Sequence, residues 1–223
     1  MNTTNAARLI LLPGLGADGR LFDAQRTAFP HLEVPAWLPH DRDESLPHYA
    51  ERMAATIAPT DPYYLGGASF GGMVALEMVR HLRPAPRAVL LIASCRSGQS
   101  IAPHLRYFVR FAEFLPQRTF ELGKGLTPLF ISKFGRLTPV QKEWFGAMLD
   151  GVDPAFVRWG IAAITDWEGA GDLPMPVYHI HGSDDELIPV DRVTPDRVIP
   201  GGGHLLNVTH AEAVNAFLAE HVA

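Results

Sequence analysis

Short apolar runs alternate with amphipathic stretches along most of the chain. Each run is apolar throughout and bounded by turn residues, which predicts strands buried on both faces. The predicted strands are 8–14, 31–39, 62–69, 87–95, 176–182 and 196–203, and the predicted helices are 20–29, 45–59, 71–84 and 209–222. This alternation predicts an α/β fold with a mostly parallel sheet of about six strands and helices on both faces.

Local signals refine two of these elements. Pro35 weakens the strand at 31–39, because proline has no N–H for a sheet ladder. Thr209 and Glu212 have the spacing of a capping box, which would start the last helix at this point.

The pattern changes over residues 97–170. This segment has helical periodicity broken by proline and glycine, no convincing strand, and more than half of the aromatic residues of the chain. We interpret it as a helical cap inserted into one structural domain, whose core comprises residues 1–96 and 171–223.

Composition narrows the class of protein. The 223 residues are 47% hydrophobic, enough for one large domain with a sizeable core. A net charge of −5 does not suggest nucleic acid or an anionic membrane as a partner. Cys95 is the single cysteine, so no internal disulfide can form. The apolar run near the N-terminus is too short for a signal peptide or a membrane span, so we expect a cytoplasmic protein.

Ser69 lies between pairs of glycines at the junction of a predicted strand and a predicted helix. The sequence GASFG at residues 67–71 is a Gly-x-Ser-x-Gly motif. In a nucleophile elbow the serine has a strained backbone, and its neighbours two positions away must be very small. A glycine-rich turn whose serine only caps the helix would look the same.

A serine nucleophile needs a base, and the base needs an orienting carboxylate. Asp184 and Asp185 follow the predicted strand 176–182, and His204 follows the strand at 196–203. Both places lie at the carboxyl edge of the sheet, where open parallel sheets carry their sites. His210 is an alternative base, but its place in the first turn of the last helix favours His204.

These motifs together resemble the α/β-hydrolase family, in the order Ser, Asp, His that is typical of it. The resemblance spans nearly the whole chain: "GGASFGGMVALEM" resembles the elbow, "HGSDDELIP" the acid loop and "PGGGH" the base loop. It implies a triad of Ser69, Asp185 and His204. It also implies an oxyanion hole made by the backbone N–H groups of Phe70 and Leu15. Many members have His-Gly before the second donor, where this chain has Pro13 and Gly14.

Other interpretations of the same residues compete. Gly14-x-Gly16-x-x-Gly19 after a strand, with Asp41 further on, also fits a dinucleotide-binding fingerprint, although the helix that follows is short. His179, His181 and Asp184 could form a metal cluster, but the spacing is incomplete. For the two histidines, packing inside the protein is the simpler interpretation. No P-loop motif is present.

The resulting hypothesis is a serine esterase that cleaves a small or medium carboxylic ester and uses no metal or organic cofactor. Two alternatives are a C–C hydrolase or lyase-synthase of the same fold and a non-catalytic ligand-binding relative. The aromatic residues of the cap suggest an apolar acyl or aromatic ester: Phe108, Phe111, Phe114, Trp144, Phe145 and Trp159. Its cations would suit a carboxylate-bearing substrate: Lys124, Lys133, Lys142, Arg106, Arg110, Arg118, Arg136 and Arg158.

Two further points concern the core. Cys95 follows a predicted strand, either buried or at the floor of a pocket. The resemblance also implies that the first two strands of the family are missing. The exposed edge would permit a homodimer, so monomer and homodimer both stay open.

Overall fold

The computed structural model describes residues 8–57, 59, 62–104, 131 and 133–222. Its centre is a six-stranded sheet in the order β2-β1-β3-β4-β5-β6, with every neighbouring pair parallel. The strands are β1 (Arg8–Leu12), β2 (Leu32–Glu33), β3 (Tyr63–Ala68), β4 (Val89–Ile92), β5 (Val177–Gly182) and β6 (Arg197–Ile199). The predicted α/β fold with a parallel sheet of about six strands is confirmed.

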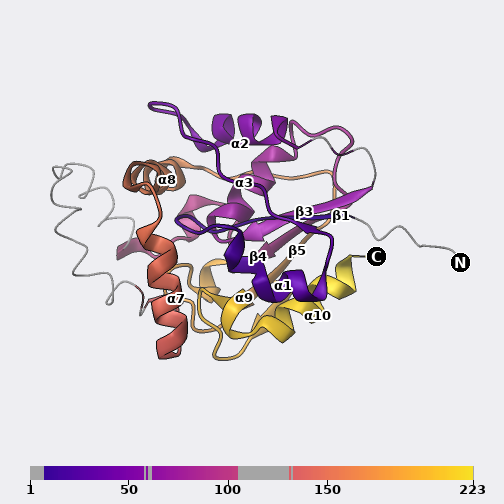
Figure 1. The fold of residues 1–223 in the computed structure, drawn as a ribbon. Helices are drawn as coiled ribbons and strands as arrows, with labels where there is room; N and C mark the ends of the chain where they lie inside the picture. The colour runs from indigo at the N-terminus through magenta and orange to yellow at the C-terminus, as the bar shows by residue number, and fades with distance from the viewer. Residues whose placement is uncertain (1–7, 58, 60–61, 105–130, 132, 223) are drawn as a thin grey trace, which may run out of the picture.

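Helices cover both faces of this sheet (Figure 1). In that view α2 (Leu46–Ala55) and α3 (Phe70–Met78) lie above it, and α1 (Asp23–Ala28), α9 (Leu206–Thr209) and α10 (Ala211–His221) lie below. Two longer helices stand at one side, α7 (Pro139–Asp150) and α8 (Pro154–Asp166). The short 3₁₀ helices are η1 (Gly19–Phe22), η2 (Gly98–Ser100) and η4 (Val190–Arg192).

The core is split into two apolar layers because successive strand residues point to opposite faces. Ile10 and Leu12 of β1 pack in the layer with α2 and α3, whereas Leu9 and Leu11 pack in the layer with α10. All four side chains are at most 2% exposed. This two-sided burial explains why the strands are apolar throughout.

The predicted capping box at Thr209 is wrong. Thr209 is the last residue of α9, and its hydroxyl donates to the Leu205 carbonyl oxygen at 3.0 Å. The following helix, α10, begins after His210, with no side-chain cap. The sequence pattern missed the short α9, whose own last turn satisfies the threonine hydroxyl.

Residues 97–170 lie between β4 and β5 in the chain, and the described part of this segment contains helices but no strand. Trp167, just after α8, donates its Nε1–H to the buried carboxylate of Glu77 in α3 at 2.7 Å. That residues 97–170 form a cap, and that the chain divides into a core and a cap, stay predictions. In the described residues, no helix is long and apolar enough to cross a membrane.

Candidate active site

The predicted site residues gather at the carboxyl edge of the sheet, because each follows the end of a strand. Leu15 follows β1, Ser69 follows β3, Asp185 follows β5 and His204 follows β6. Parallel strands place these ends on one edge, so residues far apart in sequence meet there.

Ser69 sits in a strained turn between β3 and α3. Its φ of 50° and ψ of −121° lie in a region that residues other than glycine rarely adopt. A Cβ on Gly67 would come within 2.5 Å of the Gly71 backbone, and a Cβ on Gly71 would collide with the Leu12 and Pro13 carbonyl oxygens. The two glycines are therefore required by space, as the motif predicts.

A second serine, Ser94, lies just after the end of β4 and supports this turn. It follows Ala93, whose φ is 45°, and its fully buried hydroxyl donates to the Ser69 carbonyl oxygen at 2.7 Å. The Ser69 N–H donates to the Ile92 carbonyl oxygen at 2.9 Å. The strained residue is thus fixed on both sides of its Cα. No sequence motif singles out Ser94.

Ser69, His204 and Asp185 form one chain of hydrogen bonds. The Ser69 Oγ lies 2.7 Å from His204 Nε2, and His204 Nδ1 lies 2.7 Å from Asp185 Oδ2. Since a carboxylate only accepts, His204 carries its proton on Nδ1 and receives the serine hydroxyl at Nε2. His204 is 6% exposed and Asp185 is 4% exposed, whereas Ser69 is half-buried. The geometry is the one that a nucleophile, a base and an orienting acid would need, and the catalytic roles of the three residues stay a prediction.

Asp185 is held as an anion. Its Oδ1 accepts the N–H groups of Leu187 and Ile188, both at 2.9 Å. Burial opposes the charge, but His204, the Ile188 N–H and His181 outweigh it and hold the pKa of Asp185 below its usual range. Asp184 is exposed and accepts from its neighbour Ser183, so it takes no part in the chain.

The loop that carries His204 is packed against residues 134–135. The ring of Phe134 meets the His204 ring edge-on at 5.6 Å between centroids, and the Phe134 carbonyl oxygen accepts from the Leu205 N–H at 3.0 Å. A Cβ on Gly203 would come within 2.5 Å of the Gly135 Cα. Phe134 was not singled out from the sequence. His210, the alternative base, bonds instead to its neighbour Thr209 at 2.9 Å.

The predicted oxyanion loop lies against the elbow. A Cβ on Gly14 would lie 3.7 Å from the Ser69 Cβ, so the backbone before Leu15 runs beside the nucleophile. The Leu15 side chain packs on Gly160 of α8, where even one methyl group would collide with it. Phe70 begins α3, so its N–H belongs to the free N-terminal end of a helix. The use of these N–H groups as an oxyanion hole stays a prediction.

Aromatic side chains gather around Phe70. Trp37, from the loop after β2, and Phe156, from α8, have ring centroids 5.3 Å and 6.4 Å from Phe70. Trp159 of α8 is 6.1 Å away and donates its Nε1–H to the Glu44 carbonyl oxygen. Of the other aromatic residues predicted for the cap, Trp144 and Phe145 pack in the opposite layer, whereas Phe108, Phe111 and Phe114 lie outside the described residues.

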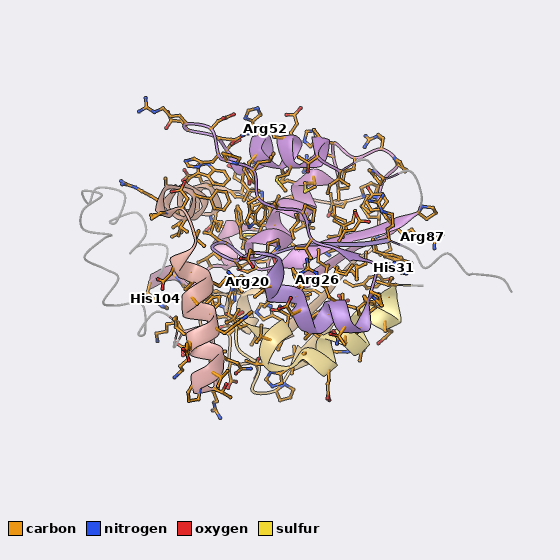
Figure 2. The ribbon with its side chains drawn as sticks, in the orientation of Figure 1. Arg20, Arg26, His31, Arg52, Arg87 and His104 are labelled. Carbon is orange, nitrogen blue, oxygen red and sulfur yellow. The ribbon has the colours of Figure 1, made fainter. Side chains whose placement is uncertain are left out.

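Arg52 ties the loop before α2 to that helix. It lies on α2 in Figure 2, and its guanidinium bonds to Glu44 at 2.9 Å and to the Pro39 carbonyl oxygen at 3.1 Å. Arg52 also pairs with Asp41 at 3.1 Å, well beyond the end of β2. Asp41 is thus engaged in a loop anchor rather than placed at a strand end as a ribose-binding acid would be. Together with Gly14 lying at the elbow, this favours the oxyanion interpretation of the glycine loop.

A cavity of about 700 Å³ lies between the start of α2 and α8, and none of the three triad residues lines it. Arg158 lines this cavity, beside Arg42, Asp43 and Asp166. The other described cations of the segment face elsewhere. Lys133 pairs with Glu186 at 2.5 Å, Arg136 lies 3.9 Å from Asp184, and Lys142 is exposed. Arg106, Arg110, Arg118 and Lys124 lie outside the described residues.

The metal interpretation of the histidines finds no support. In the part of the chain that the structure describes, no group of three or more His, Cys, Asp or Glu residues could hold a metal ion. His179 and His181 bond to each other, and Asp184 points to Ser183. Cys95 is fully buried, which raises the pKa of its thiol to about 12, so it is a packed thiol.

Comparison with known proteins agrees with this architecture. The model of the alpha/beta hydrolase family matches residues 9–217, so the chain belongs to that family. None of the curated proteins matches the chain. The family assignment supports a hydrolase.

Solved structures share the fold at low sequence identity. A thermophilic esterase from Thermogutta terrifontis, studied with malate bound, has a TM-score of 0.74 at 19% identity over 96% of this chain and 88% of its own. A hydrolase from Pseudomonas aeruginosa PA01 has a TM-score of 0.76 at 18% identity, over 97% of this chain and 91% of its own. An esterase from Exiguobacterium antarcticum has a TM-score of 0.70 at 13% identity, over 97% of this chain and 92% of its own.

Proposed function

We propose that the protein is a serine hydrolase that cleaves a small or medium carboxylic ester through an acyl-enzyme. The observation that carries the proposal is the continuous chain from Ser69 Oγ through His204 to Asp185, with 2.7 Å at each step. Asp185 is held as an anion, and its carboxylate fixes the tautomer of His204 by accepting from Nδ1.

In this mechanism His204 Nε2 takes the proton of the Ser69 hydroxyl as Oγ attacks the ester carbonyl. Asp185 stabilises the imidazolium that forms. The tetrahedral intermediate then expels the alcohol, which receives the proton from His204. Water, activated by the same histidine, attacks the acyl-enzyme and releases the acid. No metal or organic cofactor is required for these steps.

The developing oxyanion would be held by the N–H groups of Phe70 and Leu15. Removing one donor of this kind typically costs about 3 kcal/mol of transition-state stabilisation. The position of Phe70 at the start of α3 adds the positive end of the helix dipole. The backbone at Gly14 runs beside Ser69, since a Cβ on Gly14 would lie 3.7 Å from the Ser69 Cβ, and this supports the next residue, Leu15, as the second donor.

An apolar acyl or aromatic group is the substrate class that we favour. Trp37 and Phe156 pack around Phe70, the residue after Ser69, with ring centroids 5.3 Å and 6.4 Å from its ring, so the surroundings of the elbow are aromatic. Two of the similar structures are named as esterases, which agrees with this choice of bond. The proposed enzyme would work on small molecules, as a monomer or a homodimer in the cytoplasm.

Hydrolysis of p-nitrophenyl acetate, butyrate, octanoate and decanoate by wild type, Ser69→Ala and His204→Ala tests the proposal. We expect turnover by the wild type and a loss of about 10³-fold or more in each variant. The chain-length profile would give the size of the acyl site. No turnover of any ester by folded wild type would refute the esterase proposal and favour a C–C bond enzyme or a non-catalytic relative.

A further inference from the structure

Two buried histidines lie behind the acid of the triad. His179 and His181 alternate along β5, so both point into the same apolar layer, and they are 3% and 0% exposed. His179 Nε2 lies 3.0 Å from His181 Nδ1. His181 Nε2 lies 2.8 Å from the Ile188 carbonyl oxygen and 3.3 Å from Asp185 Oδ2. The two histidines are therefore linked to the acid of the triad through Ile188, whose carbonyl oxygen bonds to His181 and whose N–H donates to Asp185.

The acceptors around these rings fix where their protons lie. His181 Nε2 faces only oxygen acceptors, so it carries a proton. Burial lowers the pKa of His181 despite the nearby Asp185 carboxylate, so the ring is neutral and its Nδ1 has a lone pair. That lone pair needs a donor, which His179 Nε2 can supply. If His179 held its proton on Nδ1 instead, two lone pairs would face each other at 3.0 Å.

His181 Nε2 meets two oxygens of the acid loop, residues 182–189. One is the carbonyl oxygen of Ile188, whose N–H donates to Asp185 Oδ1. The other is Asp185 Oδ2, the oxygen that accepts from His204; it lies 3.3 Å from His181 Nε2 as a close electrostatic contact, because the Nε2–H points to the Ile188 carbonyl oxygen. His181 thus contacts the loop where it closes and the carboxylate that the loop presents.

We propose that His181, oriented by His179, is a positioning residue that holds the Asp185 carboxylate in line with His204. The residues that determine activity would then run in the order Ser69, His204, Asp185, His181 and His179, each in contact with the next. This inference rests on the proposed serine hydrolase chemistry. Neither histidine touches substrate, and neither has to exchange a proton during the reaction.

During turnover the Asp185 carboxylate has to keep both its charge and its orientation. When His204 becomes an imidazolium, Asp185 must stay ionised and must keep Oδ2 on the Nδ1–H. A neutral His181 holds the acid loop through the Ile188 carbonyl oxygen, and its ring lies beside the carboxylate without adding a second full charge. Without that hydrogen bond the loop can shift the Ile188 N–H that holds Asp185 Oδ1, and the orientation of the base is lost.

His181→Phe removes both ring nitrogens but keeps a planar ring, and His181→Gln restores an amide donor that can take the place of Nε2. We expect His181→Phe to lower kcat by about tenfold to a hundredfold. Losses of this size are typical when a residue that orients a directly acting side chain is removed. KM should change little, because no substrate contact is lost. His181→Gln should recover most of kcat. Ile180→Val is the matched control, since Ile180 is fully buried on the other face of β5.

The His204 Nδ1–H gives a second readout that does not depend on turnover. A proton held between imidazole and carboxylate gives a far-downfield ¹H resonance, which His204→Ala would assign. We expect this resonance to move or disappear in His181→Phe and to persist in Ile180→Val. If wild type hydrolyses no ester, the proposed function fails, but this resonance still decides whether His181 positions the acid.

Unchanged kcat and an unchanged His204 resonance in folded His181→Phe would overturn the proposal. An equal loss of kcat in Ile180→Val would do the same, because it would show a general effect of core packing. If His181→Phe does not fold, His179→Leu takes its place. It leaves His181 itself in place but removes the ring that faces His181 Nδ1, and it should lower kcat by about threefold to tenfold; no loss in that variant would also overturn the proposal.

Discussion

The elbow, residues 67–72, and the acid loop hold their side chains by different physical means. At the elbow small residues let backbone segments touch, and Ser69 is fixed through its own N–H and C=O groups. In the acid loop the Asp185 carboxylate is fixed by three N–H donors, from Leu187, Ile188 and His204, that converge on its two oxygens. The elbow should therefore be sensitive to added volume, and the acid loop to lost hydrogen-bond donors and charge.

The largest effect that we expect from a single atom change is on catalysis at the acid loop. Asp185→Asn replaces an acceptor by an amide and would impose the wrong tautomer on His204, so kcat should fall by about 10⁴-fold. Ester turnover measures this loss, and Asp184→Asn, on the exposed neighbour, is the matched control. Similar losses in the two variants would contradict the assignment of the acid.

At the elbow, volume should matter most. Gly71→Ala would push a methyl group into the Leu12 and Pro13 carbonyl oxygens, and we expect it to lower the free energy of unfolding by about 3 kcal/mol or more. Gly146→Ala in α7 is the control, because its Cβ would meet only Ile131 at an ordinary 3.7 Å. Urea denaturation of both variants makes the comparison, and equal stabilities would disprove the steric account.

The buried histidines predict a dependence of stability on pH. Burial lowers the pKa of His179 to about 3, so the native ring stays neutral where the unfolded ring takes up a proton. The free energy of unfolding should therefore fall as the pH drops below about 6.5. Between about pH 6 and pH 4, wild type should lose about 1.4 kcal/mol per pH unit more than His179→Leu. Urea denaturation across this range tests it, and parallel curves would argue against a neutral buried His179.

The smallest effect should come from an exposed contact of the same acid loop. Lys133 and Glu186 pair at 2.5 Å, but both side chains are about half exposed. A double-mutant cycle with Lys133→Ala and Glu186→Ala should give a coupling of about 0.5 kcal/mol or less. Thermal or urea denaturation would measure it. A coupling of several kcal/mol would show that this ion pair, rather than the buried donors, fixes the loop.

Much of this architecture could be read from the sequence because its signals are local. Continuous apolar runs indicated buried parallel strands, and short motifs singled out Ser69, Asp185 and His204, which the structure brings into one hydrogen-bonded chain. Whether they catalyse a reaction stays a prediction. Ser94 and Phe134 have no motif, since each matters only through a contact with a residue distant in sequence.

The histidines of β5 show a second limit of the sequence. Alternation along a strand predicted that His179 and His181 face one way, and packing was the simpler interpretation. Their relation to Asp185 depends on how the acid loop folds back so that the Ile188 carbonyl oxygen meets His181. The contact between the Ile188 carbonyl oxygen and His181 arises only in the folded loop, so no sequence pattern indicates it.

The central claim is that Ser69 is a nucleophile activated by His204. Incubation with diethyl p-nitrophenyl phosphate, followed by intact mass and peptide mapping, tests it without knowledge of the natural substrate. The account predicts one diethyl phosphoryl group on Ser69 in the wild type and far slower labelling of His204→Ala. A folded wild type that stays unlabelled, or carries the label on another residue, would contradict it.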